Sequence, residues 1–367
     1  MTKQSSFWDL TPADLREYVG AMGVPAYRAD QLLGWAYKRL VDSYAAMTDL
    51  PAALRARLAL ELPMTNLPAV AEQRSADGST RKLLLRLDDG NSVESVLMEY
   101  DPTDAGRGRE TVCVSTQAGC AMGCTFCATG QQGFLRNLSS GEITRQVLHF
   151  ARGLREEGRH VTNIVFMGMG EPLANYAVLM KAITILTSPD GFGLGARRIT
   201  VSTVGLVPMM RRLAAERLQI GLAVSLHTPD DEQRRKLVPT ARFSVEEILA
   251  AADDYAAATG RRYTVEYALI EKENDTPELA RRLVALVRGR NCHVNLIPVN
   301  PTANPSTRRS SRGRVIDFEQ ILRDGGINST VRVEKGIDIA AGCGQLRGAE
   351  EGRHAVSPVD TVWLLRS

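Results

Sequence analysis

Three cysteines, Cys120, Cys124 and Cys127, stand within eight residues in the run GCAMGCTFC, and their spacing C-x3-C-x2-C supplies three thiolates and no fourth. A structural zinc site requires four tetrahedral ligands, whereas an iron–sulfur cubane held by three cysteines leaves one iron open. Cysteines that only fill a core would be flanked by apolar residues, but here the neighbours are mostly small or polar. We therefore predict a 4Fe–4S cluster with one iron available for chemistry, rather than zinc.

The same spacing resembles the cluster motif of the radical S-adenosylmethionine (SAM) enzymes, in which the amino and carboxylate groups of SAM occupy the open iron. A motif match is a hypothesis until its structural context is found. The resemblance implies that the rest of the chain forms a SAM-binding barrel.

The composition indicates a large protein without a membrane or secretory signal. The chain has 367 residues and a hydrophobic content of 44%, which suits a catalytic body with a smaller addition. No apolar run is long enough to cross a membrane and no leader pattern is present, so we expect a cytoplasmic protein. Six cysteines in so long a chain do not make a disulfide framework. The net charge of +3 does not demand nucleic acid, and basic pairs such as Arg308-Arg309 individually suit solvated helix faces or strand ends.

The first part of the chain predicts a helical module, which is followed by a β-hairpin. The expected helices are one that Thr11 caps, with Pro12 in its first turn, and those over residues 29–41 and 51–60. The expected strands of the hairpin are 83–87 and 93–100, with an Asp-Gly turn between them.

From residue 112 onward, strands alternate with helices. The expected strands are 112–115, 163–168, 199–203, 221–226, 263–270, 293–299 and 330–334. The expected helices include 141–154, 177–187, 245–256, 277–287 and 315–323. Repeated βα units of this length imply a parallel sheet with helices outside it. We predict an α/β fold with a partial (βα)6 barrel, and a site at the carboxyl ends of its strands.

A glycine-rich segment, GMGEP at residues 168–172, follows the predicted strand 163–168 directly. Glycines in this position let the backbone approach a ligand closely, and Glu171 can accept from the ammonium group of SAM. An ordinary βα turn would explain one glycine but not Gly170, Glu171 and the following proline together.

Short polar residues end the next strands. Ser202 ends one strand, and Ser225 and His227 flank Leu226 at the end of another, where they can bind a ribose or carboxylate or simply cap a helix. Asn300 precedes a proline, a pattern that more often marks a turn than a ligand contact.

Two further cysteines stand apart from the cluster motif. Cys343 lies between glycines after the last predicted strand, which favours a reactive thiol over core packing. Cys113 lies on a predicted strand and fits a core thiol equally well, and Cys292 reads as structural.

With these residues assembled, the sequence resembles the RlmN-type radical-SAM methyltransferases, which methylate carbon 2 of an adenosine in large-subunit ribosomal RNA and in certain tRNAs. The resemblance spans nearly the whole chain and rests on the segments 115–120, 128–134, 166–176, 201–208, 225–229 and 341–346. The related Cfr-type enzymes methylate carbon 8 of the same adenosine. The segments QQGF at 131–134 and GEP at 170–172 are more similar to the carbon-2 group.

The resemblance implies a mechanism with two SAM molecules per turnover. One SAM methylates Cys343, and a second, bound at the cluster, is cleaved to a 5′-deoxyadenosyl radical that takes hydrogen from the S-methyl group. The resulting radical adds to carbon 2 of the adenine. Cys113 then removes the proton from carbon 2 and attacks the Cys343 sulfur, which releases methyladenosine and leaves a Cys113–Cys343 disulfide that must be reduced.

The resemblance also implies roles for other residues. Glu94, in the segment VESV at 93–96, matches a glutamate described in the family as the acceptor of the carbon-2 proton. Cys113 is the other candidate for that role. The residues implied for the SAM site are Gly170, Glu171, Ser202, Ser225, Leu226, His227 and Asn300.

The implied partners are large-subunit ribosomal RNA, tRNA and a flavodoxin-type electron donor, and we expect a monomer. The expected parts are a helical accessory, RNA-binding domain at 1–75, a β-hairpin extension at 76–110, the barrel at 111–350 and a tail at 351–367. The alternatives are a Cfr-type methyltransferase, a glycyl-radical activase, and a non-enzymatic RNA-binding or zinc module. The last would not explain Gly170-Glu171 or the βα repeats.

Overall fold

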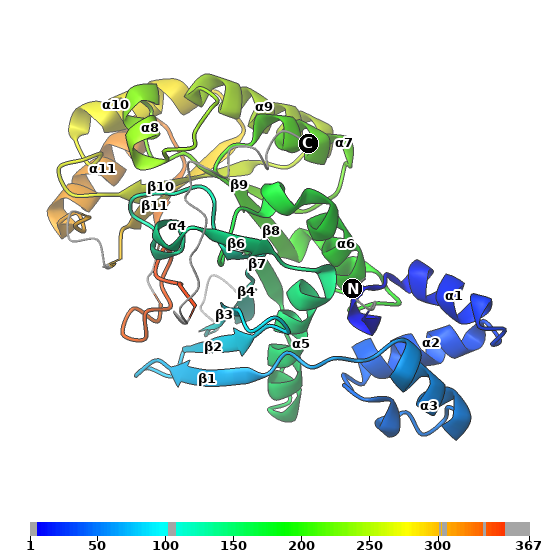
Figure 1. Ribbon diagram of the computed structural model, residues 1–367. Coiled ribbons are helices and arrows are strands. Elements are labelled where there is room, and N and C mark those ends of the chain that lie inside the picture. The colour runs from blue at the N-terminus through cyan, green and yellow to red at the C-terminus, as the bar shows by residue number, and fades with distance from the viewer. Residues whose placement is uncertain (1–5, 102–107, 301, 303–306, 333–334, 349–367) are drawn as a thin grey trace.

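The structure is a computed structural model that describes residues 6–101, 108–300, 302, 307–332 and 335–348 (Figure 1). Its amino-terminal module is helical. The elements are η1 (Phe7–Asp9), α1 (Pro12–Ala21), α2 (Tyr27–Leu33), η2 (Gly34–Lys38), η3 (Tyr44–Ala46) and α3 (Ala52–Glu61). Thr11 caps α1 in a capping box with Asp14, as the sequence predicts. The helix expected over 29–41 differs, because α2 ends at Leu33 and continues as the π-helix η2.

The rest of the chain is built on one ten-stranded sheet with the order β1-β2-β3-β4-β7-β8-β9-β10-β11-β12. Its strands are β1 (Ala69–Arg74), β2 (Thr80–Arg86), β3 (Ser92–Tyr100), β4 (Arg109–Cys113), β7 (Asn163–Phe166), β8 (Ile199–Thr203), β9 (Gly221–Ser225), β10 (Tyr263–Leu269), β11 (Cys292–Pro298) and β12 (Ser329–Val331). Strands β1 to β4 pair antiparallel, and β4 to β12 pair parallel. The predicted hairpin is therefore β2 and β3, and it continues the main sheet.

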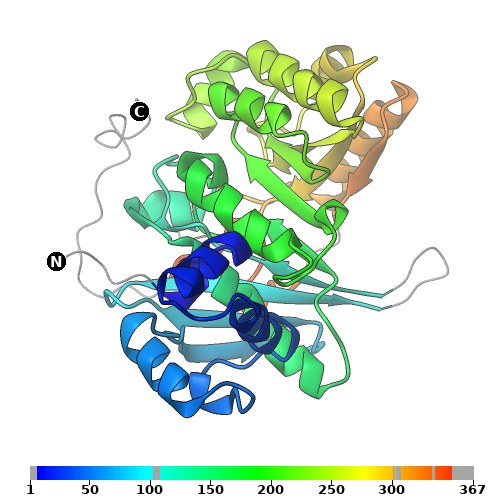
Figure 2. The ribbon, with the colours of Figure 1, turned by 90° about the vertical axis from the view of Figure 1, so that its right-hand side faces the viewer.

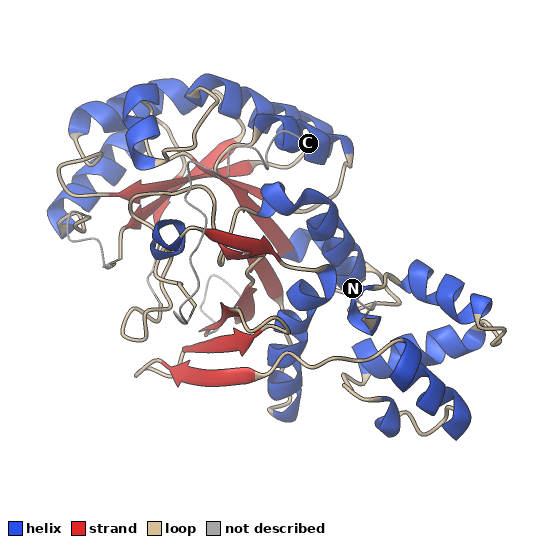
Figure 3. Cartoon of the chain, in the orientation of Figure 1, coloured by secondary structure: helices blue, strands red, loops and turns tan. Residues whose placement is uncertain are grey.

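Helices connect the parallel strands and cover the outer side of the curved sheet (Figures 1 and 3). They are α5 (Ser140–Glu156), η4 (Pro172–Asn175), α6 (Tyr176–Thr187), η5 (Ala196–Arg198), α7 (Val207–Ala215), α8 (Asp231–Leu237), α9 (Val245–Thr259), α10 (Pro277–Val287) and α11 (Arg312–Asp324). The short helix α4 (Ala128–Gln132) lies instead beside the three-cysteine segment, between the strands Gln117–Gly119 and Phe134–Asn137. Strands β1 and β12 stand at opposite ends of the strand order, so among the described residues the sheet does not close. The predicted α/β fold with an open parallel barrel is confirmed.

A small hairpin, β5 (Gln117–Gly119) and β6 (Phe134–Asn137), is separate from the main sheet and encloses the three-cysteine segment. Its two strands meet closely, since a Cβ on Gly119 would lie 2.0 Å from the carbonyl oxygen of Gly133. Gly119 also has a φ of +72°, a backbone conformation that glycine adopts without strain. The hairpin therefore holds both ends of the cysteine segment together.

The helical module packs against α5 and α6, as Figure 2 shows with the blue helices lying against the green ones. Leu148 of α5 and Ile185 of α6 belong to the module's own apolar core. Asp9 accepts a hydrogen bond from the backbone N–H of Gly141, at 2.7 Å, and so helps to cap α5. Two buried or half-buried arginines of α5 reach carbonyl groups of the module, Arg145 that of Thr65 and Arg152 that of Leu40.

Among the described residues, we find no helix that combines the length and the apolar character required to span a membrane.

Candidate active site

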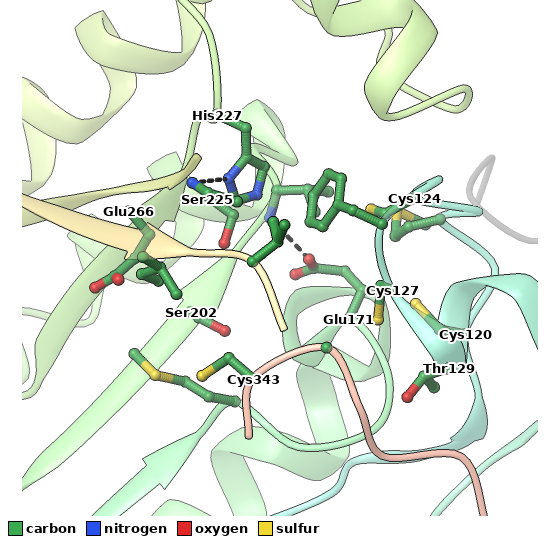
Figure 4. A pocket seen from close by; sticks show the side chains of 18 of the residues that line it. Cys120, Cys124, Cys127, Thr129, Glu171, Ser202, Ser225, His227, Glu266 and Cys343 are labelled. Atoms are coloured by element: carbon green, nitrogen blue, oxygen red, sulfur yellow. Dashed lines mark hydrogen bonds between the residues drawn. The ribbon is translucent and has the colours of Figure 1, made fainter. Parts of the chain in front are cut away.

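A cavity opens at the carboxyl ends of β7 to β11, where parallel sheets of this kind carry their sites (Figure 4). We call it the cluster cavity. The predicted site residues that line it are Cys120, Cys124, Cys127, Gly170, Glu171, Ser202, Ser225, His227, Asn300 and Cys343. The fold therefore brings together residues that are scattered over most of the chain.

The three cysteines of the motif lie side by side on one wall of the cluster cavity (Figure 4). Burial raises the pKa of all three thiols above the ordinary value for cysteine. In the part of the chain that the structure describes, no three His, Cys, Asp or Glu side chains are close enough to hold one metal ion. The segment supplies three thiols and no fourth, which suits a cluster with one open iron better than a tetrahedral zinc site.

Glu171 is held rigidly in the cavity by the backbone around it. Its Oε1 accepts from the N–H of Leu173 at 3.0 Å and its Oε2 from the N–H of Val204 at 2.9 Å. Burial raises the pKa of this carboxyl group to about 7, in spite of those two hydrogen bonds. A buried carboxylate without a cationic partner in its hydrogen bonds is suited to bind an ammonium group.

Only glycine fits at position 170. Its φ is +100°, and a Cβ there would lie 2.5 Å from the Cβ of Gln117. The Gln117 side chain in turn accepts from the backbone N–H of Glu171, at 2.9 Å. A glycine is therefore required for Glu171 to be held over the cavity.

His227 follows β9 with a φ of +67°, a conformation that histidine adopts rarely. Its Nδ1 accepts from the backbone N–H of Ala268, at 3.1 Å, and its ring packs edge-on against Phe126. Because Nδ1 accepts, the neutral ring carries its proton on Nε2. Burial lowers the pKa of His227 to about 3, so the ring is neutral at physiological pH.

A second cavity adjoins the first, and we call it the substrate cavity. Cys113, at the end of β4, lines the substrate cavity only, whereas Cys343, Arg332 and Asn300 line both. Burial raises the pKa of the Cys113 thiol to about 12. The thiol of Cys343 therefore stands between the space beside the three motif cysteines and the space beside Cys113.

Cys343 is carried by a loop that contacts the cluster segment. The backbone N–H of Ala128 donates to the carbonyl of Gly344 at 2.7 Å, and the hydroxyl of Thr129 donates to the carbonyl of Leu346. Asn300 donates from its side-chain amide to the carbonyl of Cys343 at 3.2 Å. The loop is therefore held from both the cluster segment and the end of β11.

Two of the predicted site residues do not line either cavity. Leu226 is fully buried, and its backbone N–H donates to the carbonyl of Glu266 at 3.0 Å. Glu94, on β3, is buried in an ion pair with Lys82. Ser202 and Ser225 do line the cluster cavity, and the hydroxyl of Ser202 donates to the carbonyl of Phe166 at 2.9 Å.

Sequence reasoning missed two charged residues of the site. Glu266, on β10, lines the cluster cavity and accepts from the side-chain amide of Asn295 at 2.8 Å. Arg332 follows β12, and the nearby Cys343 and Glu266 help to raise the pKa of its guanidinium. Burial raises the pKa of Glu266. The sequence does contain a signal for Glu266, because it is the single acidic residue in the mostly apolar strand YTVEYALI.

A partly open parallel sheet with a three-cysteine segment after its first parallel strand defines a radical-SAM enzyme. The model of the Radical SAM superfamily matches residues 114–284, and that of the "Ribosomal RNA large subunit methyltransferase N-terminal domain" matches residues 6–62. A 4Fe–4S cluster and SAM are therefore the cofactors of this chain, in agreement with the spacing of the cysteines.

Similar proteins show to which family of radical-SAM enzymes the chain belongs. The chain is 52% identical to "Ribosomal RNA large subunit methyltransferase N" of Nitrosopumilus maritimus over 94% of this chain and 98% of that protein. It is 49% identical to "Probable dual-specificity RNA methyltransferase RlmN" of Chloroflexus aurantiacus, over 98% and 96%. A crystal structure of a radical SAM methyltransferase from Sphaerobacter thermophilus has a TM-score of 0.90 and 52% identity, and covers 94% of this chain and 99% of that one. The chain belongs to the RlmN family of radical-SAM RNA methyltransferases.

Proposed function

We propose that this chain methylates carbon 2 of an adenosine in large-subunit ribosomal RNA, with Cys343 as the methyl carrier. The observation that carries the proposal is the position of Cys343, which lines both the cluster cavity and the substrate cavity. Carbon 2 of adenine is an electrophilic amidine carbon, so the methyl group of SAM cannot be transferred to it by ordinary displacement. A carrier that reaches both spaces provides the alternative route.

The residues of the cluster cavity divide into two sets in this proposal. Cys120, Cys124 and Cys127 hold the 4Fe–4S cluster, which together with SAM supplies the radical that activates the carrier methyl group. Gly170, Glu171, Ser202, Ser225, His227 and Asn300 bind SAM, and Leu226 positions the backbone between Ser225 and His227. Support for the second set comes from Glu171, which is buried and has no cationic hydrogen-bond partner among the described residues, and from the Oδ1 of Asn300, which is buried and has no partner among them.

The two thiols of the substrate cavity have successive roles. The Cys343 sulfur takes a methyl group by displacement and later holds the RNA through that carbon. Cys113 then attacks the Cys343 sulfur, which breaks the bond from sulfur to carbon and leaves a disulfide that a reductant must open. Because burial raises the pKa of Cys113 to about 12, this thiol keeps its proton until a charge nearby changes. The Arg332 guanidinium acts against that rise and so favours the Cys113 thiolate.

The proposal extends to substrates, partners and domains. The names of the relatives include both large-subunit ribosomal RNA and dual specificity, so we include tRNA as a second substrate. The target adenosine must leave its stack to reach the substrate cavity. We assign RNA binding to the helical accessory domain at 1–75, with the extension at 76–110 and the barrel at 111–350. The tail at 351–367 lies outside the described residues. We further propose that a flavodoxin-type protein donates the electrons, and that the protein is a monomer in the cytoplasm.

Nucleoside mass spectrometry tests the function. Reconstituted protein is incubated anaerobically with SAM, a reductant and unmodified large-subunit RNA, beside a Cys343→Ala variant. We expect 2-methyladenosine from the wild type and none from the variant. If 8-methyladenosine forms instead, the Cfr-type alternative is correct, and if no methyladenosine forms while the cluster is intact, the RNA substrate is a different one.

A further inference from the structure

The loop that carries Cys343 is held on its other side by two charged residues of the β2–β3 hairpin. The Nζ of Lys82 and the Oε1 of Glu94 lie 3.0 Å apart. Lys82 also donates to the carbonyl of Ala340, at 3.3 Å, and Glu94 Oε2 accepts from the backbone N–H of Arg347, at 2.8 Å. The ion pair thus contacts the loop both before and after Cys343.

Both charges are buried. The exposed fraction is 10% for the Lys82 side chain and 9% for that of Glu94. A buried ion pair repays its desolvation only if further hydrogen bonds satisfy its remaining donors and acceptors. Here the Cys343 loop supplies those bonds, since the N–H of Gly348 also approaches Glu94 Oε2, at 3.4 Å. The hairpin and the loop therefore stabilise one another.

We infer that the Lys82–Glu94 pair acts as a clasp that fixes Cys343 between the two cavities, so that both residues are positioning residues for the reaction. The reaction that these two residues assist is the proposed function and rests on it, whereas the clasp rests on the observed contacts of Lys82 and Glu94 with the Cys343 loop.

This inference gives Glu94 a different role from the proton acceptor that the family resemblance implies. Glu94 lines neither cavity, and each of its carboxylate oxygens already has a partner, Oε1 in Lys82 and Oε2 in the loop backbone. A general base must come within hydrogen-bond reach of the proton that it removes. Glu94 therefore acts through the loop rather than on the adenine.

The hairpin offers a matched control. Arg81, the neighbour of Lys82, pairs with Glu99 across the same two strands at 3.0 Å, and its side chain is 11% exposed. This second pair contacts Glu157 of the α5 end rather than the Cys343 loop. Glu99 also pairs with Arg159, at 2.7 Å. Glu99→Gln therefore removes a charge and its two ion pairs from the same hairpin without touching the loop.

The first test measures how fast N-ethylmaleimide labels Cys343 in the cluster-loaded protein under anaerobic, native conditions, with Cys292→Ser as the background and peptide mass spectrometry as the readout. We expect Glu94→Gln and Lys82→Met to raise the labelling rate about tenfold, because each removes charge-assisted hydrogen bonds to the loop. Glu99→Gln should change it by less than about twofold. No rise in the first two variants, or an equal rise in Glu99→Gln, overturns the clasp. This assay uses neither SAM nor RNA, so its result is independent of the proposed function.

The second test separates the clasp from the proton acceptor. Cys343 is methylated by displacement: the thiol gives up its proton to solvent, its sulfur forms a bond to the SAM methyl carbon, and the sulfonium bond to that carbon breaks with its electron pair going to the departing S-adenosylhomocysteine. This step requires neither RNA nor a residue that removes a proton from the adenine. We expect Glu94→Gln to lower the rate of Cys343 methylation in the absence of RNA, whereas unchanged methylation combined with an accumulating RNA adduct establishes the proton acceptor and overturns the clasp.

Discussion

Asn300 and Cys343 are joined by a hydrogen bond from the Asn300 side-chain amide to the Cys343 carbonyl, at 3.2 Å. The bond links the end of β11 to the loop of the carrier cysteine. The other polar atom of the amide, Oδ1, is buried and has no hydrogen-bond partner in the part of the chain that the structure describes. A buried acceptor of this kind requires an explanation, and a SAM molecule in the cluster cavity provides one.

Replacing Asn300 should therefore weaken SAM binding and loosen the carrier loop together. We expect Asn300→Ala to raise the Kd for SAM about tenfold in the reconstituted protein, because a buried hydrogen bond to the ligand is lost. Isothermal titration calorimetry measures this change, and the exposed Asn291→Ala serves as the control. An unchanged Kd would mean that the orphaned oxygen does not bind SAM.

Glu171→Gln keeps the shape of the side chain but removes its charge. We expect this variant to bind SAM at least about tenfold more weakly, because a hydrogen bond to a charged group is worth about 1.5–3 kcal/mol. The cluster absorbance should stay at the wild-type level, since Glu171 supplies no thiolate. Equal affinity of the two proteins, measured by calorimetry, would exclude Glu171 as the partner of the SAM ammonium group.

Cys113→Ala leaves Cys343 without a thiol to release it. We expect the variant to methylate Cys343 normally and then to remain bonded to RNA, so that a protein–RNA adduct accumulates while free methyladenosine is lost. Denaturing gel electrophoresis with labelled RNA detects the adduct. Cys292→Ala, which removes a cysteine outside both cavities, should release its product like the wild type. Normal turnover by Cys113→Ala would show that another group opens the bond.

His227 should make the protein sensitive to acid. The pKa of His227 is lowered to about 3 in the folded protein but is about 6.5 in the unfolded chain, so below pH 6.5 only the unfolded state takes up the proton. The free energy of unfolding should thus fall by about 1.4 kcal/mol per pH unit from this residue alone, or about 2 kcal/mol between pH 6.5 and pH 5.

The variant for this test is His227→Asn, because asparagine tolerates the positive φ and its Oδ1 can replace Nδ1 as the acceptor for Ala268. Urea unfolding of the apoprotein at several pH values compares the two chains. We expect a shallower acid slope in His227→Asn than in the wild type or in the exposed-site control His160→Asn. Parallel slopes would show that His227 is not buried in its neutral form.

Local patterns were sufficient to predict much of this structure. The hairpin of β2 and β3 follows from an Asp-Gly turn between apolar runs, and the parallel strands follow from β-branched runs at regular spacing. The strand ends then placed Glu171, Ser225 and Asn300 at one cavity. These features depend on near neighbours in the chain, which a sequence displays directly.

Features that depend on distant contacts were not predictable in this way. Strand β1 is exposed at every residue and shows no alternation, so only its pairing with β2 reveals it. The helix α8 has only seven residues, and its buried Arg234 reads as part of a basic run. Arg332 belongs to the site because β12 pairs with β11, which places Arg332 at the cavity beside Glu266, a residue of β10 that is distant in the sequence.

Asp9 caps α5 and so links the helical module to the helix that follows the cysteine segment. Ser139 caps the same helix, which begins directly after β6, the strand that encloses the cysteine segment, and Arg136 of β6 pairs with Glu142 at 2.8 Å. The helical module and the cysteine segment are therefore joined through a short, bonded path rather than a free tether. If the module binds RNA as proposed, its fixed distance from the cysteine segment selects an adenosine by its distance along the RNA as well as by sequence.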